Sequence, residues 1–185
     1  MAAAVAIVDR GGTEGLSMRA VARKLGLAPN ALYYYFPDRA MLKAAVAAEG
    51  IRRIHAVLKK AAFGPPGADA VRCACRSYLR FARSHSALYA MMMKKHPDSP
   101  ELLAARACFR ELSLGLFGSV GNPQAAPKAN YASWALLHGL AVLEREALLE
   151  HPGLSADASE AISVLLSGLS GAQAGERRSA NRRKK

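Results

Sequence analysis

Residues 15–39 decide the fold, and they read GLSMRAVARKLGLAPNALYYYFPDR. Ser17 precedes a segment whose apolar residues recur at helical spacing, and a serine oxygen at that place accepts a free N–H of the first helical turn. Those apolar residues are Met18, Val21, Ala22 and Leu25. Gly26 ends this helix without strain, and Pro29 suits the first position of the next helix, where an N–H would be unpaired anyway. The stretch therefore predicts two short helices joined by a tight turn.

The second of these helices is expected to run from about Pro29 to Phe36. Its buried side should hold Leu32 with either Tyr33 or Phe36, and we expect Leu25, Leu32 and Phe36 in the core. The residues left to face outward are Asn30, Ala31, Tyr34 and Tyr35. Two helices joined in this way can place the second one in a DNA major groove, which is about 12 Å wide, while the first crosses the phosphate backbone.

Apolar residues at helical spacing predict helices along the rest of the chain, and no alternating β-branched run occurs. The first expected helix covers residues 2–9 and ends at the Gly11-Gly12 pair. Asp38 should cap a long helix that continues to Phe63. The later helices are expected at 70–83, 86–94, 100–120, 128–150 and 156–169. We therefore expect an all-α fold of about nine helices.

Proline and paired glycines at residues 64–67 interrupt this helical pattern and suggest a domain boundary. We expect a helix-turn-helix DNA-binding domain at residues 1–48, with a linker helix to about residue 63. A larger effector-binding and dimerisation domain is expected at residues 64–171. Residues 172–185 should form a disordered basic tail, because they have no apolar period.

The formal net charge of +12 is concentrated at the two ends of the sequence. Residues 1–60 carry ten Lys/Arg and four Asp/Glu, a net +6, whereas residues 61–170 carry ten and nine, a net +1. Residues 171–185 carry six and one, a net +5. A surface that binds a polyanion should therefore lie in the first 60 residues or in residues 171–185. The charge of residues 171–185 is explained equally well by a basic tail that is simply solvated.

The sequence lacks the motifs that several other classes of protein require. The five histidines are scattered, and the sequence has no His-Glu-x-x-His motif, Cys/His cluster, Gly-rich phosphate loop or Gly-x-Ser-x-Gly elbow. We therefore expect no enzyme activity, no cofactor and no metal. The absence of a long apolar run and of a secretion signal favours a cytoplasmic location. The thiols expected to be reduced and in the core are Cys73, Cys75 and Cys108.

Residues 2–48 resemble the tetracycline-repressor (TetR) family. The resemblance rests on the Gly11-Gly12 pair, a helix capped by Ser17, a recognition helix with Leu-Tyr-x-x-Phe at residues 32–36, and a basic residue, Arg39, at the start of the next helix. Ala28 departs from the pattern, because it stands where the family usually has a serine cap, which costs the helix up to about 2 kcal/mol. The segment ahead of the first helix also lacks the basic arm common in the family.

The resemblance implies phosphate contacts for several of these residues. Ser17 and Tyr33 would donate hydroxyl hydrogen bonds to phosphates, and Arg39 would do the same with charge assistance, with Lys43 nearby. Arg19 would reach either a phosphate or a guanine edge, where its planar fork can bind two acceptors.

The resemblance also implies contacts to bases. Asn30 would read an adenine through two hydrogen bonds or else face water, and Ala31 and Tyr34 would pack on a thymine methyl group. Tyr35 would pack equally well at the groove edge.

A single helix-turn-helix contacts too little DNA to be selective, so we expect a twofold homodimer. The expected interface helices are residues 128–149 and 156–169, because a helix that is apolar on nearly every side needs cover from its own domain and from a partner. Trp134, His138 and Gly139 are similar to the Trp-His-Gly motif of one class of TetR-family C-terminal domains. The tryptophan and histidine are either a packed core pair or ligand contacts. The acidic residues expected to be solvated are Glu144, Glu146 and Glu150.

The resemblance further implies a small-molecule effector bound in the C-terminal helices. Methionine and aromatic side chains there suit a plastic apolar pocket, and they suit plain core packing as well. The pocket candidates are Tyr78, Phe81, Met91, Met92, Phe109, Phe117, Trp134 and His138. Because few charged groups fall inside these helices, we expect an apolar or weakly polar effector.

Together these expectations describe a ligand-responsive transcriptional regulator that binds a DNA operator and acts as a repressor. A small apolar effector would release it from the operator. One alternative is a constitutive DNA-binding protein without an effector. The other is a helical small-molecule carrier or enzyme that keeps the N-terminal helices as a scaffold.

Overall fold

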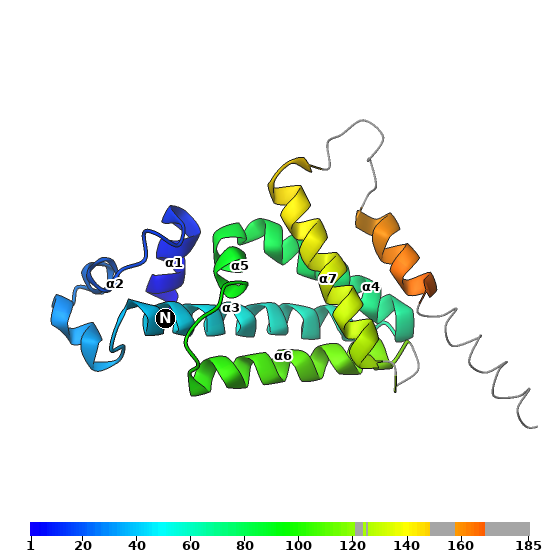
Figure 1. Ribbon diagram of the computed structural model, residues 1–185, viewed down its shortest axis with the longest axis horizontal. Coiled ribbons are helices and arrows are strands. Elements are labelled where there is room, and N and C mark those ends of the chain that lie inside the picture. Colours follow the sequence, from blue (N-terminus) through cyan, green and yellow to red (C-terminus); the bar gives the residue numbers. More distant parts are fainter. Residues whose placement is uncertain (121–123, 125, 149–157, 169–185) are drawn as a thin grey trace, which may run out of the picture. The chain divides into compact units, whose positions relative to one another are not determined.

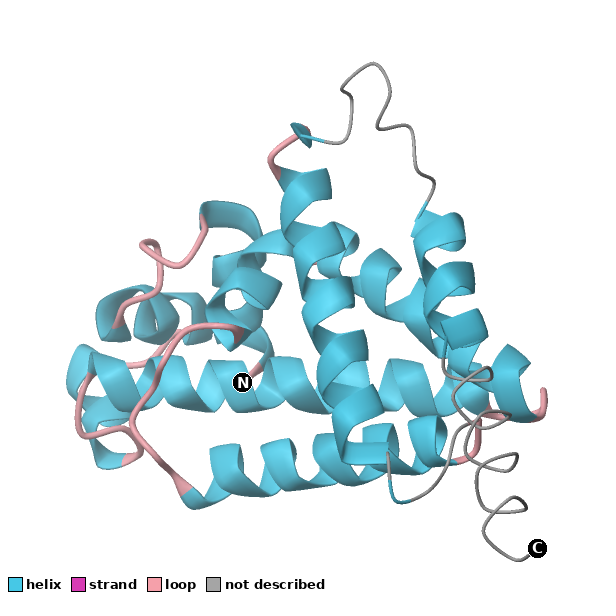
Figure 2. Cartoon of the chain, turned by 45° about the vertical axis from the view of Figure 1, so that its right-hand side comes forward, coloured by secondary structure: helices cyan, strands magenta, loops and turns pink. Residues whose placement is uncertain are grey.

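A computed structural model describes residues 1–120, 124, 126–148 and 158–168 of the chain, and these residues form helices and loops without a strand (Figures 1 and 2). The all-α prediction is confirmed. The elements are α1 (Ala2–Gly11), α2 (Met18–Leu25), the 3-10 helix η1 (Pro29–Tyr34), α3 (Arg39–Ala62), α4 (Gly67–Ser84), α5 (Ser86–Met92), α6 (Pro100–Gly118) and α7 (Ala126–Arg145). Residues 158–168 are also helical.

The helices group into two compact units. Residues 1–56 and 84–109 make up the first unit, and the second consists of residues 57–83 with the described part of 110–185. The domain limits expected from the sequence, 1–48 and 64–171, remain predictions. The predicted basic tail at 172–185 lies outside the described residues.

In the first unit, local signals set the ends of α2. The Ser17 Oγ accepts the Ala20 N–H at 3.1 Å, so the predicted N-cap is confirmed. Gly26 has φ 68° and follows the helix in the left-handed conformation. The Leu27 N–H then donates to the Ala22 carbonyl at 2.9 Å, which closes the turn in a Schellman pattern. This turn directs the chain from α2 into η1.

The recognition segment differs from the prediction in two ways. It is a six-residue 3-10 helix that ends at Tyr34, whereas the sequence pattern suggested a helix to Phe36. Leu32 is buried as expected, Phe36 is only half-buried, and Tyr33 is exposed. Leu25 is 48% exposed, so its assignment to the core was wrong. It is the last residue of α2, and the Schellman turn follows immediately, which leaves its side chain at the edge of the unit.

α5 packs closely on α3 within the first unit because of Gly50. A Cβ atom at this position would lie 2.7 Å from the Met92 Sδ and 3.1 Å from the Leu88 Cδ1. Both distances are shorter than ordinary van der Waals contact. Gly50 therefore lets the Met92 side chain rest directly on the α3 backbone.

The three cysteines have different environments. Cys75 is buried, Cys73 is half-buried, and Cys108 on α6 is exposed. Burial raises the pKa of the Cys75 thiol to about 12, because the thiolate would lose its hydration. The expectation of core thiols is therefore correct for Cys75 and wrong for Cys108.

We predict that Gly50→Ala destabilises the protein although alanine is the better helix former. Overpacking costs about 1–3 kcal/mol, which outweighs the gain of up to about 1 kcal/mol from helix propensity. Gly50→Val should cost more, because two further methyl groups meet Met92. Urea unfolding of the purified variants measures both effects.

Gly115→Ala is the matched control, because a Cβ at this helical glycine would meet nothing within 4 Å. It should stabilise the protein by up to about 1 kcal/mol. Equal unfolding free energies for the alanine variants at positions 50 and 115 would contradict the close contact between α3 and α5.

Candidate nucleic-acid interface

η1 presents an unusual concentration of exposed aromatic side chains. Tyr34 is 87% exposed and Tyr35 is 69% exposed. Their rings meet edge to face with centroids 5.1 Å apart. Asn30 is also exposed, whereas Ala31 is half-buried. Large aromatic rings are usually covered in folded proteins, so a surface of this kind indicates a binding face.

Basic residues accompany this surface on α2 and α3. Arg19, Arg23 and Lys24 are exposed on α2, and none of them has an acidic partner within the described part of the chain. Lys43 is half-buried on the second turn of α3. Ser17 uses its oxygen as the cap of α2, and its hydroxyl proton is still able to donate to a second acceptor. The three basic residues of α2 thus carry positive charge that no acidic side chain among the described residues neutralises.

Arg39 has contacts that the sequence did not suggest. Its Nε donates to the Leu16 carbonyl at 2.8 Å, and its Nη2 donates to the Glu14 carbonyl at 3.0 Å. The Glu14 carboxylate lies 3.6 Å from the same nitrogen. Two donors of the guanidinium therefore hold the loop that leads into Ser17, and the Nη1 group has no hydrogen-bond partner among the described residues. Arg39 positions the backbone ahead of α2 in addition to its predicted phosphate contact.

Asp38 completes the junction between η1 and α3. Its Oδ1 accepts the Met41 N–H at 2.8 Å, which confirms the predicted cap of the long helix. Because α3 begins at Arg39, directly after this cap, the guanidinium starts from a fixed turn. The local bonds of Asp38 and Arg39 therefore connect α3 to the loop before α2.

The eight residues predicted for an effector pocket fall in both units. Met91 and Met92 are buried in the first unit, and Phe109 is half-buried there. The buried members in the second unit are Tyr78, Phe81 and Phe117. Trp134 is 43% exposed on α7, and its ring stacks on the His138 ring with centroids 5.9 Å apart. Their role in ligand binding remains a prediction.

Four arginines on α4 were not considered as a group in the sequence analysis. They are Arg72, Arg76, Arg80 and Arg83, spaced by four, four and three residues. This spacing puts them on one face of a helix. The spacing alone could have identified this row in the sequence. It was missed because residues 61–170 as a whole have a net charge of only +1.

Comparison with known proteins identifies the family. A family model described as "Bacterial regulatory proteins, tetR family" matches residues 1–46, and one described as "Tetracyclin repressor-like, C-terminal domain" matches residues 71–175. The chain belongs to the TetR family. Membership in the Trp-His-Gly class remains a prediction.

Two bacterial relatives of this TetR-family chain are similar over most of its length. The uncharacterized HTH-type transcriptional regulator YobS of Bacillus subtilis is 25% identical over 169 residues, which cover 90% of this chain and 88% of YobS. The uncharacterized HTH-type transcriptional regulator Rv0681 of Mycobacterium tuberculosis is 27% identical over 150 residues, covering 80% of this chain and 69% of Rv0681.

Solved structures share the TetR fold at lower identity. A protein of unknown function from Rhodococcus sp. RHA1 has a TM-score of 0.78 at 23% identity, covering 91% of this chain and 92% of its own. A variant of TetR from Acinetobacter baumannii AYE, solved in complex with minocycline, has a TM-score of 0.67 at 17% identity, covering 93% of this chain and 94% of its own.

Family membership establishes the general function. TetR-family proteins are DNA-binding transcription factors that dimerise on operators, and this chain is accordingly a DNA-binding transcriptional regulator and not an enzyme. No helix among the described residues is long and apolar enough to cross a membrane. The same residues contain no group of three or more His, Cys, Asp or Glu side chains that could hold a metal ion.

We predict that Arg39→Ala weakens binding to all DNA sequences and also loosens the loop before α2. A buried hydrogen bond from a charged group contributes about 1.5–3 kcal/mol to the stability of the contact that it forms. Because the Arg39 side chain is partly exposed, we expect its loss to destabilise the loop by about 1 kcal/mol. The Ala20 N–H, which donates to the Ser17 Oγ, should then exchange faster with solvent, and amide hydrogen exchange measures this loosening of the cap.

Arg39→Lys separates the two roles, because lysine keeps the charge but has no planar fork for two carbonyls. We expect its amide exchange to resemble that of Arg39→Ala. Lys43→Ala serves as the control, and it should lower DNA affinity without changing the exchange of Ala20. If Arg39→Lys restores the wild-type exchange rate, the positioning role is wrong.

Proposed function

We propose that this regulator is a homodimeric, ligand-responsive repressor that reads its operator with η1. The observation that carries the proposal is the exposure of Asn30, Tyr33 and Tyr34 on η1, directly after a helix capped at Ser17. A short helix with polar and aromatic side chains free of the core can lie against base edges in the major groove. A DNA operator as partner also implies a cytoplasmic location.

We assign phosphate contacts to residues at the margins of this surface. Ser17 and Tyr33 donate through hydroxyl groups, and Arg39 and Lys43 contribute positive charge. Such contacts fix the position of the protein on the duplex without reading its sequence. Arg19 is exposed on the first turn of α2, where it reaches a phosphate or a guanine edge.

We assign base contacts to the centre of the surface. Asn30 reads an adenine through its amide, and Tyr34 packs on a thymine methyl group beside Ala31. The 87% exposure of Tyr34 supports this assignment, because the side chain is accessible to a base without leaving the core.

The dimer interface is proposed to include α7 and the helical residues 158–168. Tyr131 is 68% exposed and Trp134 43% exposed on α7, and Val164 is 74% exposed on the last described helix. Exposed apolar side chains gathered on a helix mark a surface that needs cover. A twofold dimer would present two copies of η1 about 34 Å apart, one turn of DNA.

The effector is proposed to act by coupling ligand binding to DNA binding. The structurally similar A. baumannii TetR variant was solved with minocycline, which supports a small-molecule site in the C-terminal helices of this chain as well. A ligand that prefers the conformation unable to bind DNA by about 1–3 kcal/mol would weaken operator binding about 5- to 150-fold.

We predict that Asn30→Ala changes preference at one base pair of the operator, whereas Lys43→Ala lowers affinity for every sequence. The salt dependence of binding should also fall by about one unit for Lys43→Ala, because one phosphate contact is lost. Binding of both variants to a randomised operator library measures the two effects. Identical sequence profiles would contradict the assigned roles.

We predict that Trp134→Glu weakens dimerisation at least about tenfold, because an unpaired charge would be buried at the interface. Leu103→Glu is the matched control, since Leu103 is 51% exposed on α6, outside the proposed interface. Sedimentation equilibrium of the two variants gives the dissociation constants. A Trp134→Glu protein that dimerises as well as the control would rule out this face of α7.

A further inference from the structure

α4 carries a row of four arginines on one face within the second unit. Positions 72, 76, 80 and 83 follow each other at intervals close to one helical turn. Like charges at this spacing repel one another by a few tenths of a kcal/mol per pair. An acidic side chain or a bound anion next to the row would relieve this repulsion.

The two outer arginines have such partners. Arg72 donates from Nη1 to the Ser163 Oγ at 2.8 Å and lies 3.9 Å from the Asp69 carboxylate. Arg83 donates from Nη2 to both carboxylate oxygens of Glu144 at 3.1 Å. The Glu144 side chain is only 19% exposed, so its prediction as a solvated charge was wrong. The row thus binds α4 to α7 and to the helical residues 158–168.

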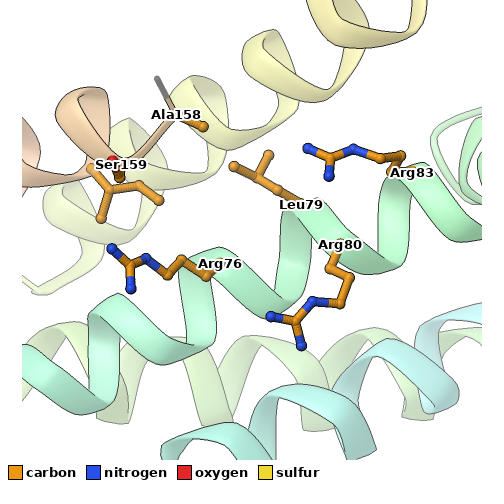
Figure 3. Close-up of a pocket in the computed structure, with 7 residues that line it drawn as sticks. Arg76, Leu79, Arg80, Arg83, Ala158 and Ser159 are labelled. Atoms are coloured by element: carbon orange, nitrogen blue, oxygen red, sulfur yellow. The ribbon is translucent and has the colours of Figure 1, made fainter. Parts of the chain in front are cut away.

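The two middle arginines have no such partner. Neither Arg76 nor Arg80 forms an ion pair or a side-chain hydrogen bond with any residue that the structure describes. Both line a cavity of about 300 Å³ between α4 and residues 158–162. The lining residues are Arg76, Leu79, Arg80, Arg83, Ala158, Ser159 and Ile162. Figure 3 shows the Arg76 guanidinium extending toward the segment with Ala158 and Ser159.

We propose that this cavity binds a small organic anion, with a carboxylate or phosphate group held by Arg76 and Arg80. The guanidinium fork can donate two parallel hydrogen bonds to either group. Leu79 and Ile162 are buried side chains of the lining and supply an apolar wall for the rest of the molecule. The ligand is therefore amphiphilic, with one charged end and a short apolar body.

The charge and size of the cavity both support this ligand class. Because Glu144 neutralises Arg83, the lining keeps a net charge of about +2 from Arg76 and Arg80. A volume of about 300 Å³ lies at the lower end of small-molecule sites. A DNA duplex does not fit a hollow of that size, and a neutral apolar effector would form no charge-assisted hydrogen bond with the exposed guanidinium groups of Arg76 and Arg80.

This inference rests on the proposed function, because it names the effector class of the same regulator, an amphiphilic anion in place of the apolar effector expected from the sequence. The anion would bridge α4 and the helical residues 158–168, the second of which belongs to the proposed dimer interface. Binding therefore adds contacts that favour one packing of that helix on α4. An effector can shift an equilibrium only through such a difference in contacts between two states.

The test uses benzoate, octanoate and phenyl phosphate as anionic probes, with benzamide and octanamide as neutral counterparts. Titration calorimetry on the full chain measures binding to the wild type, to Arg76→Gln, to Arg80→Gln and to the double variant. Arg110→Gln is the matched control, because it removes the same charge from an exposed position on α6 in the second unit.

We expect at least one anionic probe to bind the wild type and the Arg110→Gln control, and its neutral counterpart to bind at least about tenfold more weakly. The double variant should lose about tenfold or more in affinity for that anion. The inference is overturned if no anionic probe binds, or if the double variant binds the anion as well as the control. Thermal unfolding verifies that each variant is folded.

Operator binding without any probe separates failure of this site from failure of the proposed function. The double variant should bind the operator as the wild type does, within about twofold. A large loss of operator affinity in the double variant alone would overturn the inference by assigning these arginines to DNA. If the wild type binds no operator, the proposed repressor function fails, while anion binding that depends on Arg76 and Arg80 would still support the site.

Discussion

The hydrogen bonds from Arg39 to the Leu16 and Glu14 carbonyls fix the backbone that leads into the helix-turn-helix. These bonds connect the first residue of α3 with a loop more than twenty residues earlier in the chain. The cap at Ser17 follows this loop, and the turn at Gly26 then sets the direction of η1. Arg39 lies outside η1, and it helps to fix the start of the segment that carries the exposed tyrosines. A phosphate that engages the remaining Nη1 group would act on the same side chain that holds the loop.

Local chemistry explains what the sequence predicted well. The caps at Ser17 and Asp38 and the turn at Gly26 depend on residues within four positions, so the pattern alone was sufficient. The exposure of Leu25 could not be predicted in the same way. Helical spacing shows on which face of the helix a residue lies, but it does not show whether another element covers that residue. The 3-10 geometry of η1 was also beyond the pattern, since six residues span less than two α-helical turns.

Contacts between distant segments were the main gap in the prediction of functional sites. Glu144 and Arg83 are 61 residues apart, and Arg72 and Ser163 are 91 residues apart. No periodicity reveals such pairs, so the sequence could not show which of the four arginines of α4 have partners. The structure assigns partners to Arg72 and Arg83, and it leaves Arg76 and Arg80 as the two arginines of the row without a partner among the described residues. The family resemblance predicted a DNA-binding segment, but it carried no information about these arginines.

The close approach of Gly50 to Met92 constrains how this sequence can diverge. A homologue that gains a side chain at position 50 must shorten the residue at position 92 or shift α5 along α3. The two positions should therefore change together during evolution, as a small-with-large pair whose sizes compensate. Such covariation would connect a helix in the core of the first unit to a residue on the long helix that follows the recognition segment.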